Sequence, residues 1–287
     1  MKISGFTFVR NGVKFEYPFI ESIKSIMPIC DELIVVVGNS DDDTLQQIMN
    51  LKEEKIKIIQ TIWDEKLREG GKILAQQTNI ALSHITGDWG LYLQADEVIH
   101  EKYLDNILKA MRQYLHNYKV EGLLFKYIHF YGSYDYYADS RNWYRKEIRV
   151  VRNNIGVKSW KDAQGFRIDN RKMNVIEIDA YIYHYGWVKH PRAMMEKIKT
   201  FNKFWHDDEW IEKNIQMKEE FDYSIIEKLR KFEGTHPEVM KNRIENFNWK
   251  FVPPEKLKTN LKFKILDSIE RSTGIRLGEY KNYKILK

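Results

Sequence analysis

The sequence of 287 residues predicts an α/β protein with a mostly parallel, Rossmann-like sheet flanked by helices. Strand and helix patterns alternate with short connections through the first third of the chain, which favours right-handed crossovers. The stretch 33–37 is apolar at every position, as is typical of a strand buried on both faces. Helical patterns dominate from Pro191 onward. We therefore expect a mixed second half and a helical C-terminal extension.

The first half contains the clearest elements. Apolar runs predict strands at 2–9, 33–37 and 56–62 and a fourth within 87–101, with helices at 15–27, 44–51 and 72–84 between them. Pro18 must then lie in the first turn of its helix. In the second half the patterns predict a helix at 103–118 and strands at 122–130, 147–152 and 175–183. We divide the chain into a catalytic domain, 1–190, with a donor half (1–101) and an acceptor half (102–190), and an extension, 191–287.

Composition limits the classes of protein. Apolar residues are 43% and charged residues 31%, which indicates a folded, soluble chain. The single cysteine, Cys30, excludes an intrachain disulfide and is expected to be a buried thiol in a reducing compartment. Neither a leader pattern nor a membrane span is found, so we expect a cytoplasmic protein. The net charge of +6 favours phosphate-bearing partners or an anionic membrane surface. Because the charges are spread along the chain, no nucleic-acid partner is expected.

The stretch 87–101 carries the first candidate site. Its apolar strand ends abruptly in Asp96 and Glu97. Parallel sheets bind ligands beyond the carboxyl ends of their strands, which makes a metal or ligand site one interpretation. The other is a solvated loop whose acids cap the following helix.

Four pieces in order resemble the family 2 glycosyltransferases with the GT-A fold. These are Phe8-Val9-Arg10-Asn11 at the first strand end, the second strand with the acidic turn at 41–43, the helix around Asn79 with the Gly87-Asp88-Trp89 turn, and Gln94-Ala95-Asp96-Glu97, which is similar to an Asp-x-Asp motif. The resemblance covers about 2–197 and implies transfer of a sugar from a nucleotide-sugar donor, usually with inversion and with Mg²⁺ or Mn²⁺.

The resemblance also implies site residues. The donor residues would be Phe8, Arg10, Asn11, Asp42, Gln94, Ala95 and Asp96. Lys72 is added from its position just after Gly70-Gly71, from which it could approach the donor phosphates. Asp96 would hold the metal with help from His184, while His100 with Glu101 is a weaker rival. Each has a structural alternative: Asp41–Asp43 as helix caps and His184 as a core histidine. Two positions depart from the family pattern, because Gln94 and Val37 stand where Asp is expected.

An inverting transfer needs a general base near the acceptor hydroxyl. The resemblance places an acid on a loop after the metal strand, and Asp162 in the stretch 157–166 is the best candidate. Asp139 and Glu147 are the alternatives, and an ordinary surface aspartate is another interpretation. The tyrosines of 127–144 would face a saccharide or lipid-linked acceptor of cell-envelope polysaccharide synthesis, or else form cross-strand pairs.

Two further segments invite other interpretations. His206-Asp207-Asp208-Glu209 resembles a metal cluster, but its position before a helical pattern favours an N-terminal cap. The basic, amphipathic segment 256–287 predicts a helix packed on the catalytic domain or resting on the inner face of an anionic membrane. Overall we expect a metal-assisted, inverting glycosyltransferase, with a catalytically silent sugar- or partner-binding module as the alternative.

Overall fold

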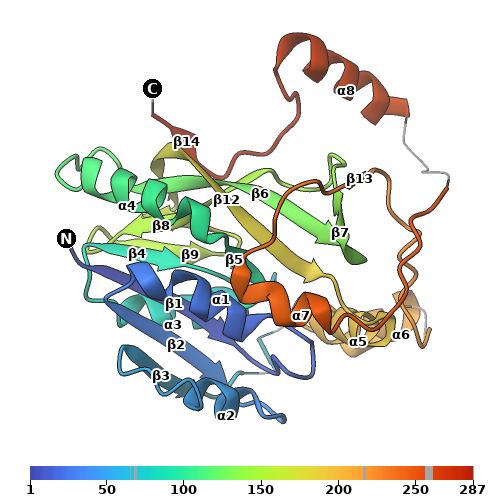
Figure 1. Ribbon diagram of the computed structural model, residues 1–287, viewed down its shortest axis with the longest axis horizontal. Helices are drawn as coiled ribbons and strands as arrows, with labels where there is room; N and C mark the ends of the chain where they lie inside the picture. The colour runs from blue at the N-terminus through green and yellow to red at the C-terminus, as the bar shows by residue number, and fades with distance from the viewer. Residues whose placement is uncertain (65, 68–69, 216–217, 256–260, 287) are drawn as a thin grey trace.

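The computed structural model describes residues 1–64, 66–67, 70–215, 218–255 and 261–286 (Figure 1). Its main sheet runs in the order β13-β7-β6-β8-β4-β1-β2-β3, with β12, β5 and β14 joined to it through β6 and β12. A small second sheet has the order β11-β10-β9. The expected α/β class, with a mostly parallel first half and a mixed second half, is confirmed.

The first half is a parallel sheet. It contains β1 (Ile3–Val9), β2 (Glu32–Gly38), β3 (Ile56–Thr61) and β4 (Trp89–Tyr92), connected by α1 (Phe19–Ile26) with η1 (Met27–Ile29), by α2 (Thr44–Met49) and by α3 (Lys72–Ser83). The chain adds β2 and β3 on one side of β1 and then returns to place β4 on the other. This reversal leaves a crevice at the carboxyl ends of β1 and β4, where open α/β sheets bind ligands.

Both faces of this sheet are covered, as the uninterrupted apolar run of β2 predicts. Leu33, Val35 and Val37 belong to the core cluster that contains α1 and α4 (Leu104–Gln113). Ile34 and Val36 belong to the cluster on the opposite face, beside α3. Cys30 is buried in the first cluster, as expected for a structural thiol.

The second half turns the sheet antiparallel. β8 (Lys146–Arg152) pairs with β4 and β6, and β6 (Gly122–Tyr131) pairs with β7 (Ser133–Ala138), all antiparallel. The long β12 (Asn174–Trp187) runs parallel to β6 and antiparallel to the short β5 (Glu97–Ile99), with His184 opposite Glu97. This pairing brings a histidine far along the chain beside Asp96. The remaining elements here are η2 (Glu101–Tyr103), β9 (Val157–Trp160), β10 (Gly165–Ile168) and β11 (Arg171–Lys172).

The C-terminal third is mainly helical, as expected. It contains α5 (Pro191–Asn202), α6 (Asp208–Asn214), β13 (Leu229–Lys231), η3 (Glu238–Met240), α7 (Lys241–Glu245), α8 (Leu261–Thr273) and β14 (Lys284–Ile285). The N-cap prediction for 206–209 is confirmed, because Asp207 accepts a hydrogen bond from the amide of Trp210 at 2.8 Å. Across the described ranges, no helix combines the length and apolar character needed to cross a bilayer.

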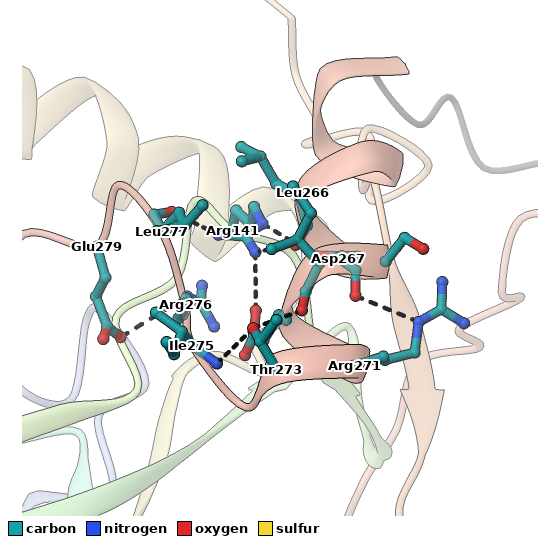
Figure 2. A network of polar contacts seen from close by, with 12 residues as sticks. Arg141, Leu266, Asp267, Arg271, Thr273, Ile275, Arg276, Leu277 and Glu279 are labelled. Carbon is teal, nitrogen blue, oxygen red and sulfur yellow. Dashed lines mark hydrogen bonds and ion pairs between the residues drawn. The ribbon is translucent and has the colours of Figure 1, made fainter.

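α8 lies at the periphery and is attached by polar contacts (Figures 1 and 2). Arg141 reaches into it, with Nε 3.0 Å from Asp267 Oδ1 and Nη2 2.9 Å from Glu270 Oε2. The same guanidinium donates to the carbonyl oxygens of Leu266 and Leu277 at 2.8 and 3.0 Å. The segment expected at 256–287 is therefore attached to the domain, although 256–260 and 287 lie outside the described residues.

Candidate functional site

A cavity of about 710 Å³ opens at the carboxyl ends of β1 and β4. The ends of both strands line it, and α5 with the residues after it forms another wall. Of the residues expected to bind donor, metal or acceptor, the cavity brings together Phe8, Arg10, Asn11, Gln94, Ala95, Asp96, Asp162 and His184. Residues that lie far apart in sequence thus share one concave site of ligand size.

Asp96 is presented by a turn that Glu97 builds. The amide of Gln94 donates to Glu97 Oε2 at 3.0 Å, and the amide of Glu97 donates to the Gln94 carbonyl at 3.0 Å. Glu97 is fully buried and forms a two-point ion pair with Arg149, with both N···O distances 2.7 Å. Tyr127 donates a further bond to it at 2.7 Å. Glu97 was one of the two acids of the possible metal site at the end of this strand. That role is wrong, because its carboxylate oxygens accept hydrogen bonds from the Gln94 amide and from Arg149.

Asp96 lies between basic groups. Its Oδ2 is 3.6 Å from His184 Nε2 and 3.4 Å from Lys197 Nζ, which also donates to the Gly186 carbonyl at 3.0 Å. Burial alone would raise the pKa of Asp96, but His184 and Lys197 hold it well below its usual range. Burial lowers the pKa of Lys197 although Asp96 opposes that effect. These two basic neighbours therefore favour the ionised form of Asp96, which faces the cavity.

Gly186 leaves room beside the two candidate ligand atoms. A Cβ at this position would lie 2.5 Å from Asp96 Oδ2 and 2.7 Å from His184 Nε2. A carboxylate oxygen and an imidazole nitrogen thus border one small space that only glycine keeps open. Among the described residues no group of three or more His, Cys, Asp or Glu is gathered for a metal. Two protein ligands still fit Mg²⁺ or Mn²⁺, because such ions take one or two carboxylates and complete their shell with phosphates and water.

The end of β1 forms the second wall. Asn11 has a left-handed backbone, φ 53°, and its Oδ1 accepts a hydrogen bond from the amide of Asp41 at 3.0 Å. The Arg10 guanidinium lies 5.4 Å from the ring centroid of Trp63, and Phe8 packs against the same indole at 6.0 Å. Trp63 lines the cavity, and its buried Nε1 has no hydrogen-bond partner among the described residues. Trp63 follows β3 and could have been expected at this sheet edge.

Two donor predictions need correction. Asp42 does not line the cavity, since Oδ1 accepts from the Thr44 amide at 3.0 Å and Oδ2 accepts from the Lys14 amide at 2.7 Å. It shapes the turn, and the neighbouring Asp41 faces the cavity instead. Lys72 lies at the start of α3 and lines a separate surface hollow with Ser83 and Ser159. Its expected approach to the donor phosphates is not supported, because the helix directs it away from the cavity.

The loop between β9 and β10 carries Asp162 to the cavity. Lys161 and Ala163 on either side have positive φ angles of 52° and 62°, which define a tight turn. Gln94 donates to the Ala163 carbonyl at 3.2 Å, linking this loop to the turn that presents Asp96. Gly71 permits the close approach, since a Cβ there would lie 2.8 Å from Asp162 Cβ. Gln94 thus has a structural role where the family pattern expects a carboxylate.

The alternative bases are less suitable. Asp139 is surrounded by cations, with Lys228 and Arg230 nitrogens at 2.8 and 2.7 Å and Arg145 at 3.5 Å. Glu147 is buried and does not line the cavity; it accepts a hydrogen bond from Gln164 at 2.7 Å. Of the three acids considered, Asp162 is the one that lines the cavity.

Glu147 makes stability depend on pH. Burial raises its pKa from 4.5 to about 7, although Arg149 opposes the shift. The folded state therefore keeps a proton that the unfolded chain loses, and this contribution is complete below pH 4.5 and lost as the pH rises through about 7. We expect thermal denaturation of the wild type to show stability falling by roughly 2–3 kcal/mol across that window. Glu147→Gln should flatten this slope, and an unchanged slope would contradict the assignment.

The tyrosine prediction is largely wrong. Tyr127, Tyr131 and Tyr134 are buried in three different core clusters, and the clusters of Tyr131 and Tyr134 include Met194 of α5 and Met240 of η3, respectively. Tyr144 lines the cavity, together with Trp187. Among the tyrosines of 127–144, the cavity lining therefore includes Tyr144 alone.

Several cavity residues come from a part of the chain that sequence reasoning left out. Met194, Lys197, Ile198 and Phe201 of α5 line it. Lys189 lies behind it, fully buried, 4.2 Å from the Tyr17 ring centroid, and burial lowers its pKa well below the ordinary lysine value. No motif marks these residues, since α5 resembles any amphipathic helix. Its lysine becomes a site residue only because α5 packs across the crevice.

Comparisons with known proteins bear on this site. The family model described as Glycosyl transferase family 2 matches residues 11–173, and no curated protein matches the sequence. Among solved structures, S. aureus TarS is 19% identical with a TM-score of 0.40, over 70% of this chain and 39% of that chain. TarS 1–349 with UDP is 18% identical and with UDP-GlcNAc 17%, each with a TM-score of 0.40 over 76% of this chain and 68% of the other.

The family match covers more than half of the chain and includes β2 to β11 with the turn that presents Asp96. It ends before His184 and α5. The chain spans well under half of the full-length TarS chain that it resembles. With its mostly parallel sheet and the crevice between β1 and β4, the chain belongs to glycosyl transferase family 2.

Proposed function

We propose that this protein transfers a sugar from a nucleoside-diphosphate sugar to an acceptor hydroxyl with inversion, assisted by Mg²⁺ or Mn²⁺. One observation carries the proposal: an ionised Asp96 with His184, and a separate Asp162, line the same cavity at the switch point of a family 2 fold. The two acids arrive from different strands, as a donor site and a base site require.

The donor would lie between β1 and the Asp96 turn. The Arg10 side chain and the aromatic rings of Phe8 and Trp63 form the wall against which a nucleobase would lie. Gln94, Ala95 and Asp96 would meet the ribose and diphosphate. Lys197 adds a positive charge on the far side of Asp96, which favours binding of an anionic diphosphate.

Asp96 and His184 are the residues that would hold the metal, with Gly186 leaving the room for it. When bound there, a divalent cation would supply stabilisation of the negative charge on the leaving diphosphate. Asp162 would take the proton of the acceptor hydroxyl as that oxygen attacks the sugar. Its loop is held to the donor turn through Gln94, so the two parts of the site keep a fixed relation.

The test is a panel of UDP-, GDP- and dTDP-sugars with the full chain, with and without Mn²⁺. We expect metal-stimulated donor hydrolysis or transfer with one nucleotide class. Metal-dependent nucleotide binding without any turnover would instead favour the silent, sugar- or partner-binding module. Absence of binding to every nucleotide would overturn the proposal.

For the division of the chain we retain 1–190 as the catalytic domain and 191–287 as the extension, although α5 of the extension lines the cavity of the catalytic domain.

The acceptor we propose is a saccharide or lipid-linked hydroxyl of cell-envelope polysaccharide synthesis, reached from the cytoplasmic side. Support for a lipid-linked acceptor comes from α8. Asp267 of this helix faces Arg141 (Figure 2), and Glu270 pairs with the same guanidinium. Leu261 and Ile265 are 72% and 55% exposed.

We expect this outer face of α8 to bind anionic membranes. Leu261 and Ile265 lie one turn apart beside the exposed Lys264 and Arg271, so apolar insertion and charge attraction act together. In vesicle co-sedimentation, the protein should bind phosphatidylglycerol-containing vesicles and not pure phosphatidylcholine. The double change Leu261→Ser and Ile265→Ser should weaken binding at least about tenfold, because it removes two inserting side chains. Equal binding to both vesicle types would contradict the proposal.

A further inference from the structure

The small sheet carries a row of cations on one side. Arg167 of β10 lies opposite Lys158 of β9 and opposite Lys172 of β11. Residues directly opposite each other on antiparallel strands point to the same side, so each strand contributes one cation to this side. Because neighbouring strands lie roughly 4.8 Å apart, the three backbone positions span about 10 Å. The other side faces the core, since Phe166 and Ile168 belong to the cluster beside α3.

Aromatic rings lie between these charges. Trp160 is on the same side of the sheet as Lys158, and Arg167 Cζ is 5.5 Å from its ring centroid. The Tyr280 hydroxyl accepts a hydrogen bond from Arg167 Nη2 at 3.2 Å. Lys172 Nζ is 5.3 Å from the ring centroid of Tyr280, which is 70% exposed. We call these five residues, Lys158, Trp160, Arg167, Lys172 and Tyr280, the outer face.

The positive charge of the outer face has no paired carboxylate in the part of the chain that the structure describes. Lys158 and Lys172 are exposed there without an acidic partner. Arg167 is only 6% exposed, and its guanidinium donates to two backbone carbonyl oxygens and to the Tyr280 hydroxyl. Protein screens the charge of a buried guanidinium less than water does, so Arg167 adds to the attraction that the two lysines exert on an anion.

The opposite side of the same sheet shows the contrast. Arg171 lies opposite Ile168, on the side that faces the core. Its guanidinium is paired with both carboxylate oxygens of Glu121, at 2.6 and 2.9 Å. The cation on that side therefore has a structural partner within the chain, whereas the charges of the outer face remain available to a ligand.

An acidic saccharide chain matches the outer face in two respects. Its acid groups can pair with the cations, and its sugar rings can lie against the exposed aromatic rings. A lipid headgroup would use the charges alone and would leave the rings without a role. A single-stranded nucleic acid would also stack on aromatic rings, but it requires a basic groove that follows its backbone, and the outer face is one short row.

The outer face lies next to the proposed base. β9 leads from Lys158 into the turn that carries Asp162, which lines the cavity. The two positions are separated by about 13 Å of chain at most, since an extended strand rises about 3.3 Å per residue. Lys161, exposed in the same turn, adds another positive charge on this path. Resting on the proposed function, we propose that the outer face binds the anionic stretch of an acidic saccharide acceptor whose end reaches Asp162.

Three variants test this assignment. Lys158→Gln combined with Lys172→Gln removes two exposed charges from the outer face. The matched control is Lys24→Gln combined with Lys109→Gln, which removes the same charge from exposed positions on α1 and α4. Tyr280→Ala removes the exposed ring. Thermal denaturation of each variant establishes that it is folded at the temperature of the binding assay.

Binding is measured with the full chain by calorimetry at low salt, without donor or metal. The probes are alginate oligosaccharides, which carry carboxylates, linear polyphosphate, and neutral dextran. We expect the wild type to bind alginate, polyphosphate or both, and not dextran. The outer-face double variant should bind about 5- to 30-fold more weakly, as expected for the loss of two exposed charge pairs, and the control should stay within about twofold. Tyr280→Ala should weaken binding of alginate, whose rings can stack, and leave binding of polyphosphate nearly unchanged.

Several results would overturn the proposal. These are no binding to either anionic probe, equal binding by the double variant and the control, and an unchanged alginate affinity in Tyr280→Ala. Tighter binding of single-stranded DNA than of both probes would assign the outer face to a nucleic acid instead. Weaker binding of the double variant to phosphatidylglycerol vesicles, with no change toward the two soluble probes, would assign it to a lipid surface.

The binding assay separates this proposal from the proposed function, because it requires neither nucleotide nor turnover. A wild type that binds the acidic probes through the outer face but binds no nucleotide would support the outer face and overturn the proposed function. A wild type that transfers sugar from a nucleotide but binds neither acidic probe would keep the proposed function and overturn the role of the outer face.

Discussion

Replacing Asp96 by Asn is expected to lower turnover by at least about 10²- to 10³-fold and to remove the metal dependence of nucleotide binding. Asp96 supplies a carboxylate that borders the space beside Gly186. An amide of the same shape keeps the packing but loses the charge that would hold a divalent cation. The measurement is turnover of the accepted nucleotide-sugar, together with nucleotide affinity at several Mn²⁺ concentrations.

Asn is preferable to Ala because Asp96 also pairs with Lys197. Both variants remove the counter-charge of Lys197, but the Asn amide oxygen can still accept a hydrogen bond from its ammonium. Ala would leave that buried group without this partner and would leave a cavity beside it, so lost activity could reflect lost stability. Asp88→Asn is the matched control, since Asp88 precedes the same strand at its opposite end and bonds the Lys2 amide at 2.7 Å. Full turnover in Asp96→Asn, with Asp88→Asn unchanged, would show the metal assignment to be wrong.

Site residues could be predicted where the neighbouring sequence alone determines their position. Phe8, Arg10 and Asn11 lie at the end of β1 or just after it, and Asp96 lies in the turn after β4, so short sequence patterns place them at one sheet edge. The tight turn after β2 was also expected, but which of its acids faces the cavity depends on two backbone amides. Asp42 bonds the amides of Lys14 and Thr44 and leaves the cavity to Asp41.

The errors arise from partners distant in sequence. Glu97 has the charge and position of a metal ligand, but Arg149 lies 52 residues later and takes both of its oxygens. Lys72 follows two glycines like a phosphate-binding residue, but α3 turns it to another surface. His184 beside Asp96 requires the antiparallel pairing of β12 with β5, and Lys197 requires α5 to cross the crevice. The local hydrophobic pattern of the sequence indicates neither the strand pairing nor the packing of α5.

Asp162→Asn is expected to lower kcat by about 10²- to 10⁴-fold, the range that general bases contribute. The amide cannot accept the acceptor's proton, but it preserves the turn between Lys161 and Ala163 and the link from Gln94 to that loop. Because Asp162 is separate from the Asp96 and His184 pair, nucleotide and Mn²⁺ affinities should stay within about twofold of the wild type. Steady-state kinetics with a nucleotide-binding titration on each variant separates the two effects.

Glu147→Gln provides the matched control for this result. Glu147 is the other acid near the loop, bonded to Gln164, but it is buried away from the cavity. If Asp162 at the cavity wall takes the proton of the acceptor hydroxyl, Glu147→Gln changes the pH dependence of stability and leaves kcat nearly intact. The opposite pattern, with kcat lost in Glu147→Gln and kept in Asp162→Asn, would identify Glu147 as the base. The loop that carries Gln164 would then have to open during transfer. Placement at the cavity surface favours Asp162, because a proton acceptor must reach the attacking oxygen directly or through one water.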